Sequence, residues 1–98
     1  MEIRVIKRAL FSLGDCAMTP GAQAVLTQVG VSPLALLARH AEGDWGELSP
    51  EDKDSNEGAV LYGNRILSCY EVGEDRTRVW VITEADRSVT TLLLPEEY

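Results

Sequence analysis

The sequence is short of cysteine, histidine and long apolar runs, and each shortage excludes a class of protein. Two distant cysteines, Cys16 and Cys69, and the single His40 cannot supply the four closely spaced ligands of a structural zinc site. No apolar run approaches the roughly 20 residues that span a bilayer. Basic residues before the apolar stretch 9–13 imitate a signal peptide, but a glycine and an aspartate end that stretch early. We therefore expect a cytoplasmic protein with reduced cysteines and no membrane segment.

Motifs that bind other metals or phosphate groups are missing as well. The acid-rich stretch 52–56 resembles the start of a calcium-binding loop, which needs glycine at its sixth position and glutamate at its twelfth. Those positions hold Glu57 and Gly63, so calcium is not expected. There is no glycine-rich phosphate loop and no GxSxG nucleophile elbow. The sequence thus predicts no metal and no cofactor.

Positive charge is scarce, and the negative charge is unevenly distributed. The 98 residues carry 9 Lys and Arg against 16 Asp and Glu, and the net charge of -7 opposes nonspecific attraction to nucleic acid or anionic lipid. Residues 41–60 hold seven acids and a single base, Lys53. A solvated surface explains such a run, and so does a surface for a basic protein partner. The length fits a single domain over residues 1–98.

Three Ser/Thr-Pro pairs indicate where helices begin. Thr19, Ser32 and Ser49 each offer a side-chain oxygen as N-cap, and the proline that follows suits the first helical position. Glycines downstream of each pair mark the helix ends. This pattern predicts helices at 20–29, 33–41 and 50–62.

The last third of the chain changes to the alternating pattern of strands. Short turns separate runs rich in β-formers, which favours an antiparallel meander. The predicted strands are 65–72, 77–84 and 88–94, with 3–10 as a candidate fourth strand. The sequence therefore predicts an α+β fold in which about three helices pack on a small antiparallel sheet of three to four strands. The strand residues expected in the core are Ile66, Val79, Val81, Ile82, Leu92 and Leu93.

Polar side chains at the ends of these elements form the candidate site. His40 ends the second helix, and Glu84 and Arg87 flank the turn between the last two strands. An imidazole, a carboxylate and a guanidinium suit metal-free acid–base work on a phosphodiester, so these three are the candidate catalytic residues. The candidate binding residues are Arg39, Asp44, Trp45, Asp86 and Thr90. We expect His40, Asp44 and Trp45 to lie near the strand turn that contains Glu84, Asp86 and Arg87.

Structural roles explain the same residues. His40 and Arg39 favour a helix C-terminus electrostatically. Trp45 can cover the core, and Asp86 can cap its own turn. Burial of His40 against apolar side chains would favour these structural roles over catalysis.

Several motifs of the chain resemble those of one family. They are FSLG at 11–14, TPGA at 19–22, LLARHAEGDWG at 36–46, RILSCY at 65–70, ITEADRSVTT at 82–91 and LPEEY at 94–98. Together they resemble a family of small bacterial proteins that are often carried on plasmids and other mobile elements. The resemblance covers most of the chain. It implies a bacterial, cytoplasmic setting and carries no biochemical activity.

The sequence therefore favours a non-catalytic accessory or interaction protein of bacterial mobile elements, with the acidic 41–60 segment as a surface for a basic protein partner. The alternative is a metal-independent ribonuclease with RNA as its substrate. Helices with an Arg-His pair, followed by an antiparallel meander, are similar in order to the barnase/EndoU/colicin/RelE-like ribonucleases. The single histidine and the acidic net charge stand against this alternative.

Overall fold

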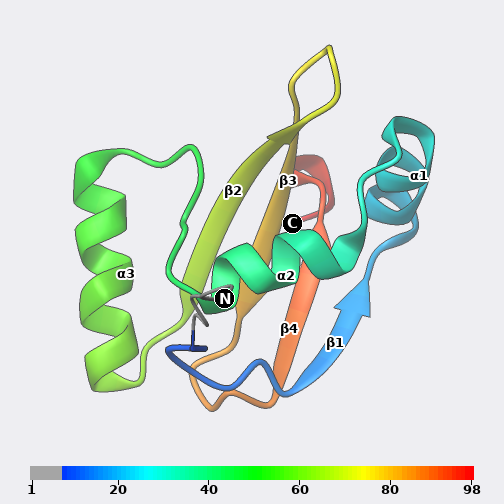
Figure 1. Cartoon of the computed structure of the whole chain (residues 1–98). Helices are drawn as coiled ribbons and strands as arrows, with labels where there is room; N and C mark the ends of the chain where they lie inside the picture. The colour runs from blue at the N-terminus through cyan, green and yellow to red at the C-terminus, as the bar shows by residue number, and fades with distance from the viewer. Residues whose placement is uncertain (1–7) are drawn as a thin grey trace, which may run out of the picture.

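Three helices and a four-stranded sheet make up the structure, a computed structural model that describes residues 8–98 (Figure 1). In chain order the elements are β1 (Asp15–Met18), α1 (Pro20–Val29), α2 (Pro33–Ala41), α3 (Pro50–Tyr62), β2 (Ile66–Val72), β3 (Thr77–Thr83), β4 (Val89–Leu93) and a 3₁₀ turn, η1 (Pro95–Glu97). The predicted α+β fold is confirmed, and the three helices have the predicted bounds.

Each helix begins where the chemistry of its first residues places the start. Thr19, Ser32 and Ser49 have extended backbones, and their side-chain oxygens accept hydrogen bonds from first-turn N–H groups that lack a helical partner. α1 and α3 end at Gly30 and Gly63, which adopt the left-handed conformation. Within residues 8–98 no single helix is long and apolar enough to cross a membrane, although α1 and α2 together meet the length and composition required, across a bend of 106°.

The sheet has the strand order β1-β4-β3-β2. β2 pairs antiparallel with β3, and β3 pairs antiparallel with β4, as the meander predicted. β1 differs, because it runs parallel to β4 with Asp15 opposite Val89 and Met18 opposite Leu92. The sheet is therefore mixed rather than purely antiparallel. Parallel neighbours need a long connection, and here three helices and two strands separate β1 from β4.

The strand that completes the sheet is not the candidate at 3–10. Residues 3–7 lie outside the described part of the chain, and residues 8–10 form no strand. The fourth strand is β1, whose four mostly exposed residues show no alternation of apolar and polar side chains. Backbone bonds at both ends hold it against β4, from the Asp15 N–H to the Ser88 carbonyl and from the Thr19 N–H to the Leu92 carbonyl.

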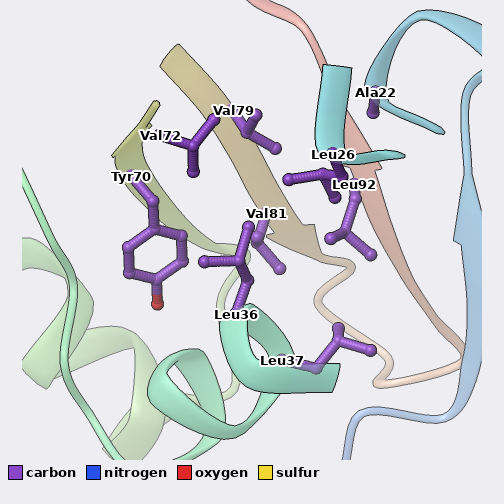
Figure 2. Packing of buried hydrophobic residues seen from close by; sticks show 9 residues of the cluster. All are labelled: Ala22, Leu26, Leu36, Leu37, Tyr70, Val72, Val79, Val81 and Leu92. Carbon is purple, nitrogen blue, oxygen red and sulfur yellow. The ribbon is translucent and has the colours of Figure 1, made fainter. Parts of the chain in front are cut away.

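α1 and α2 lie on one face of the sheet (Figure 1). Ala22 and Leu26 of α1, and Leu36 and Leu37 of α2, pack against the strand side chains that point toward them. Those strand residues are Tyr70, Val72, Val79, Val81 and Leu92 (Figure 2). All six strand residues expected in the core are buried. Two of them, Ile82 and Leu93, follow inward-facing residues directly and so belong to the opposite face of the sheet, which we call the back face.

α3 lies beside β2, at the edge of the sheet (Figure 1). It buries only Asn56 and Ala59 of its 13 residues. The Asn56 side-chain amide donates to the Leu67 carbonyl at 2.7 Å and accepts the Leu67 N–H at 3.2 Å, so it takes the place of a neighbouring strand. A small apolar cluster of Trp45, Ala59 and Ile66 completes this contact.

Candidate functional site

His40, the central candidate, lies inside the molecule. The helical spacing of α2 turns His40 toward the sheet together with Leu36 and Leu37. Its side chain is 0% exposed, and its ring lies edge-on to the rings of Phe11 and Trp45 at centroid distances of 5.2 and 6.0 Å. A polar ring buried in this way needs hydrogen-bond partners inside the protein.

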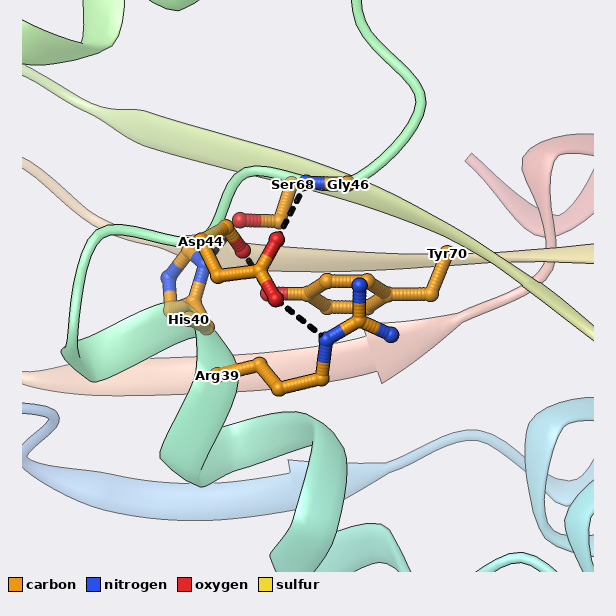
Figure 3. Close-up of polar contacts among 6 residues, drawn as sticks. All are labelled: Arg39, His40, Asp44, Gly46, Ser68 and Tyr70. Atoms are coloured by element: carbon orange, nitrogen blue, oxygen red, sulfur yellow. Dashed lines mark hydrogen bonds and ion pairs between the residues drawn. The ribbon is translucent and has the colours of Figure 1, made fainter.

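Both ring nitrogens of His40 lie against hydroxyl groups of the sheet. Nδ1 is 2.5 Å from Ser68 Oγ (Figure 3), and Nε2 is 2.9 Å from Thr83 Oγ1. Thr83 Oγ1 is 2.6 Å from Thr90 Oγ1, which donates to the Leu13 carbonyl at 2.7 Å. One hydrogen-bonded chain therefore connects α2 with β2, β3, β4 and the segment before β1.

The carbonyl at the end of this chain sets the direction of every hydrogen bond in it. A carbonyl only accepts, so the Thr90 hydroxyl proton points to Leu13. Thr90 then accepts from Thr83, and Thr83 accepts from an N–H at Nε2 of His40. Nδ1 is left as the acceptor, and Ser68 donates to it. The network thus selects the neutral His40 tautomer that carries its proton on Nε2.

Burial lowers the pKa of His40 to about 4, and the positive charge of Arg87 adds to the shift. Protonation is disfavoured because a charged ring inside the protein has no water to hydrate it. It would also place a proton on Nδ1, the nitrogen that accepts the hydrogen bond from Ser68. His40 therefore stays neutral at neutral pH. Both nitrogens are bonded within the protein, and a general base must reach its proton within roughly 3 Å, so neither nitrogen is free to act on a substrate.

Arg39 and Asp44 form an ion pair at the surface beside His40 (Figure 3). Arg39 Nε donates to Asp44 Oδ2 at 2.6 Å, which raises the pKa of Arg39 and lowers the pKa of Asp44. The guanidinium also lies 4.4 Å from the centre of the Tyr70 ring, and the Tyr70 hydroxyl donates to the Asp44 carbonyl at 2.6 Å. These contacts hold the loop after α2 on the sheet.

Trp45 and Gly46 attach the same loop to its neighbours. The buried Trp45 donates its indole N–H to Glu57 of α3 at 3.0 Å. The Cys69 N–H of β2 donates to the Trp45 carbonyl, and the Glu47 N–H donates to the Cys69 carbonyl. Gly46, between them, has φ of 73°, and a Cβ at this position would overlap the Cys69 carbonyl. The loop passes so close to β2 that only glycine fits.

Arg87 joins the strand turn to the end of α3. Its guanidinium donates to three backbone carbonyls, at 2.9 Å to Ala59, 2.7 Å to Asn64 and 3.2 Å to Glu84. Its Cζ also lies 5.5 Å from the centre of the Phe11 ring. Arg87 therefore adds side-chain hydrogen bonds to carbonyls at the end of α3, in the loop that follows and in its own turn.

Glu84 and Asp86 serve the turn between β3 and β4. Asp86 Oδ1 accepts the Ser88 N–H at 3.0 Å, and hydrogen bonds from Ser88 lower the pKa of Asp86. The Glu84 backbone accepts the Arg87 N–H at 2.9 Å and donates to the Val89 carbonyl at 3.1 Å. The turn cap that the sequence offered as an alternative for Asp86 is the role it has here.

The structure brings some of the candidate residues together and separates others. His40 and Thr90 are connected through Thr83, and Phe11 contacts both His40 and Arg87. Among residues 8–98 no hydrogen bond or ion pair joins Glu84 or Asp86 to His40, and Arg39 pairs with Asp44 alone. The bonds of the candidate catalytic residues are internal and structural.

Ser68, Asn56 and Phe11 matter to this site, and sequence reasoning did not select them. A signal exists for Ser68, because it alternates with Ile66 and Tyr70 on the inward face of a strand, and a buried hydroxyl needs a partner. Asn56 is the polar residue that α3 turns toward the sheet, but its helix carries no strong apolar stripe that would reveal the direction. Phe11 lies in an irregular segment, where only the tertiary structure assigns its neighbours.

Metal ligands and cysteine thiols are the remaining groups that could carry chemistry. Between residues 8 and 98 there is no group of three or more His, Cys, Asp or Glu side chains placed to hold a metal ion. Cys16 is exposed and Cys69 is buried, and both are free thiols.

Comparisons with protein-family models, with curated proteins and with solved structures found no match.

Proposed function

We propose that the protein is a non-catalytic accessory protein of a bacterial mobile element that acts in the cytoplasm, and that α3 binds a basic protein partner. The observation that carries the proposal is the solvent-facing side of α3, which combines large apolar residues with acids that form no ion pair among residues 8–98. We call this side the acidic α3 surface. It consists of Glu51, Asp54, Glu57, Leu61 and Tyr62.

The acids of this surface have no cation to neutralise them in the described part of the chain. The one ion pair within 4.0 Å among residues 8–98 joins Arg39 and Asp44, in the loop before α3. Lys53 is the single base of the helix. A surface with this excess of negative charge steers a positively charged partner toward it and accelerates association at low salt.

Leu61 and Tyr62 supply the apolar part of the surface. They are 78% and 80% exposed at the end of the helix. Asp54, Glu57 and Leu61 follow the three- and four-residue spacing of a helix face, so the acids and the leucine meet the same partner. Aromatic and aliphatic anchors with a charged rim are typical of protein interfaces.

The buried and fully bonded state of His40 supports a non-catalytic role over the ribonuclease alternative. His40, the histidine that the alternative requires, is 0% exposed and bonded at both nitrogens. The bacterial mobile-element setting rests on the motif resemblance, above all the ARHAEGDWG and ITEADRSVTT segments.

Affinity capture with charge-reversal variants tests this function. Wild-type protein and a Glu51→Lys, Asp54→Lys variant are used to capture proteins from a bacterial lysate, and the captured partner is purified and titrated against each. The wild type is expected to bind at least about tenfold more tightly, because each tenfold change needs only about 1.4 kcal/mol. The affinity is also expected to fall as salt rises.

Glu74→Lys, Asp75→Lys provides the matched control. It makes the same charge change at exposed residues in the turn between β2 and β3. Equal losses of affinity in both variants would mean that the partner responds to net charge alone, which contradicts a specific α3 surface. Cleavage of labelled RNA in the presence of a chelator, lost in His40→Ala, would overturn the proposal in favour of the ribonuclease.

A further inference from the structure

A groove runs between the start of α3, at Asp52, and the back face of the sheet. The half-buried side chains of Leu48, Leu67 and Trp80 line its floor, and the groove encloses about 430 Å³. A smaller hollow of about 200 Å³ continues it past Leu48 and Leu67 along the inner side of α3. The groove thus combines an apolar floor with charged residues at its sides.

The edge of β2 at this groove is closed to an additional strand. Cys69 already exchanges backbone hydrogen bonds with Trp45 and Glu47. Leu67 exchanges them with the Asn56 side chain. A bound segment therefore gains no sheet hydrogen bonds along these residues, which favours a helix, whose N–H and C=O groups are satisfied within itself.

The charged residues that line the groove favour a helix with basic side chains. Asp52 of α3 and Glu47 of the loop before it line the groove, both exposed and both outside any ion pair among residues 8–98. Arg78 lines the opposite, β3 side. A helix whose lysines or arginines lie over α3, and whose basic residues avoid β3, is complementary to this arrangement.

We infer that the groove binds a basic amphipathic helix of the partner protein, with its apolar side chains on Leu48, Leu67 and Trp80 and its cationic side chains against Glu47 and Asp52. This inference rests on the proposed function and names the partner element for it.

A synthetic peptide probes the groove directly. The probe is a helix of about 18 residues, or five turns, with leucines on one face and lysines on the other. Titrated into ¹⁵N-labelled protein, it is expected to shift the Trp80 indole resonance and the Leu48 and Leu67 amides. The Trp45 indole is buried and bonded to Glu57, so its resonance serves as an internal control. An otherwise identical peptide with glutamate for lysine is expected not to bind.

Two variants identify the site. Glu47→Lys, Asp52→Lys is expected to weaken binding of the lysine peptide at least about tenfold, whereas Glu74→Lys, Asp75→Lys leaves it within about twofold. Shifts that map away from Trp80, or equal binding of the two peptides, would overturn the groove as the site.

Leu67→Gln separates the groove from the proposed function. It removes an apolar floor residue and keeps the charge of α3. A captured partner that loses affinity for Glu51→Lys, Asp54→Lys but not for Leu67→Gln leaves the proposed function standing and refutes the groove. If Leu67→Gln fails to unfold cooperatively, the exposed Glu47→Lys, whose side chain makes no hydrogen bond among residues 8–98, takes its place in the same comparison.

Discussion

His40 ties α2 to three strands through hydroxyl groups whose order of donation ends at the Leu13 carbonyl. Polar groups buried in this way stabilise a fold only when all of them are paired, because each unpaired one costs the free energy of lost hydration. No buried side-chain nitrogen or oxygen of residues 8–98 lacks a partner. His40, the central candidate for catalysis, is thus part of a hydrogen-bonded crosslink of the core.

Stability is expected to depend on pH through His40. Its pKa is about 4 in the folded protein and 6.5 in an unstructured chain, so the unfolded chain binds the proton first as pH falls. The stabilisation is complete above pH 6.5 and is lost toward pH 4. From pH 7 to pH 5 the free energy of unfolding should fall by about 2 kcal/mol from this residue.

Urea unfolding of the wild type and of His40→Asn across this range checks the prediction. The loss should be smaller in the variant, which has no imidazole to protonate. An imidazole signal that titrates near pH 6.5 in the folded wild type would contradict the buried, neutral state.

Removing one hydroxyl from the network is expected to destabilise the protein. Thr83→Val keeps the side-chain shape but leaves the Nε2 proton of His40 and the Thr90 oxygen without their partner, at a cost of about 1–3 kcal/mol. Thr91→Val makes the same chemical change on the half-buried back face, where a change of no more than about 0.5 kcal/mol is expected. Chemical denaturation of both variants measures the difference, and equal losses would mean that the hydroxyl network adds nothing.

Among the elements, α3 is the one least held by burial. It packs only Asn56 and Ala59 into the protein, and the Arg87 guanidinium fastens its last turn to the strand turn. Much of its stability must therefore come from its caps, its acidic first turn and the helix propensity of its residues. A helix so lightly attached by apolar contacts is suited to present side chains to a partner.

Two glycines of α3 should respond in opposite directions to alanine. A Cβ at Gly58, inside the helix, meets open space, so Gly58→Ala is expected to stabilise the protein by about 0.5–1 kcal/mol. Gly63, the C-cap, has φ of +73°, so Gly63→Ala is expected to destabilise it by about 1 kcal/mol although open space surrounds it too. Thermal and urea unfolding of the two variants measure these changes. A loss of stability in Gly58→Ala would contradict the expectation that the helix accepts a Cβ at this position.

At the scale of the whole molecule, the strands at the centre of the sheet have more backbone hydrogen-bond partners than the strands at its edges. β3 and β4 are paired on both sides, β2 is closed by a loop and a side-chain amide, and β1 is short and mostly exposed. Helices cover one face, and on the back face the Trp80 ring packs against Tyr98, which is itself 64% exposed. The surfaces that the proposed partner would contact thus lie at α3 and on the back face.

Native-state hydrogen exchange should reproduce this gradient. Amides of β3 are expected to exchange most slowly, near the rate set by global unfolding, because they are bonded on both sides and lie beside the core. Amides of α3 and β1 are expected to exchange through smaller, local openings. Protection of α3 equal to that of β3 would show that α3 unfolds only with the whole molecule.

The sequence by itself determined the local structure. Thr19, Ser32 and Ser49 begin helices because each supplies a capping oxygen before a proline, and the antiparallel meander follows from short turns between alternating runs. These are interactions between residues close in the chain, and they are visible in the order of residues alone. Core residues such as Val79 and Leu92 followed from the same alternation.

The tertiary structure alone decided the contacts between residues far apart in the chain. Pairing of β1 with β4 joins residues about 75 positions apart. It uses backbone hydrogen bonds that do not depend on the type of side chain, so no pattern in the sequence predicts it. The polar residues at 39–45 and 84–90 had either a catalytic or a structural interpretation in the sequence. For His40, burial favours the structural interpretation, because it places the ring within bonding distance of Ser68 and Thr83, away from water, with both ring nitrogens bonded inside the protein.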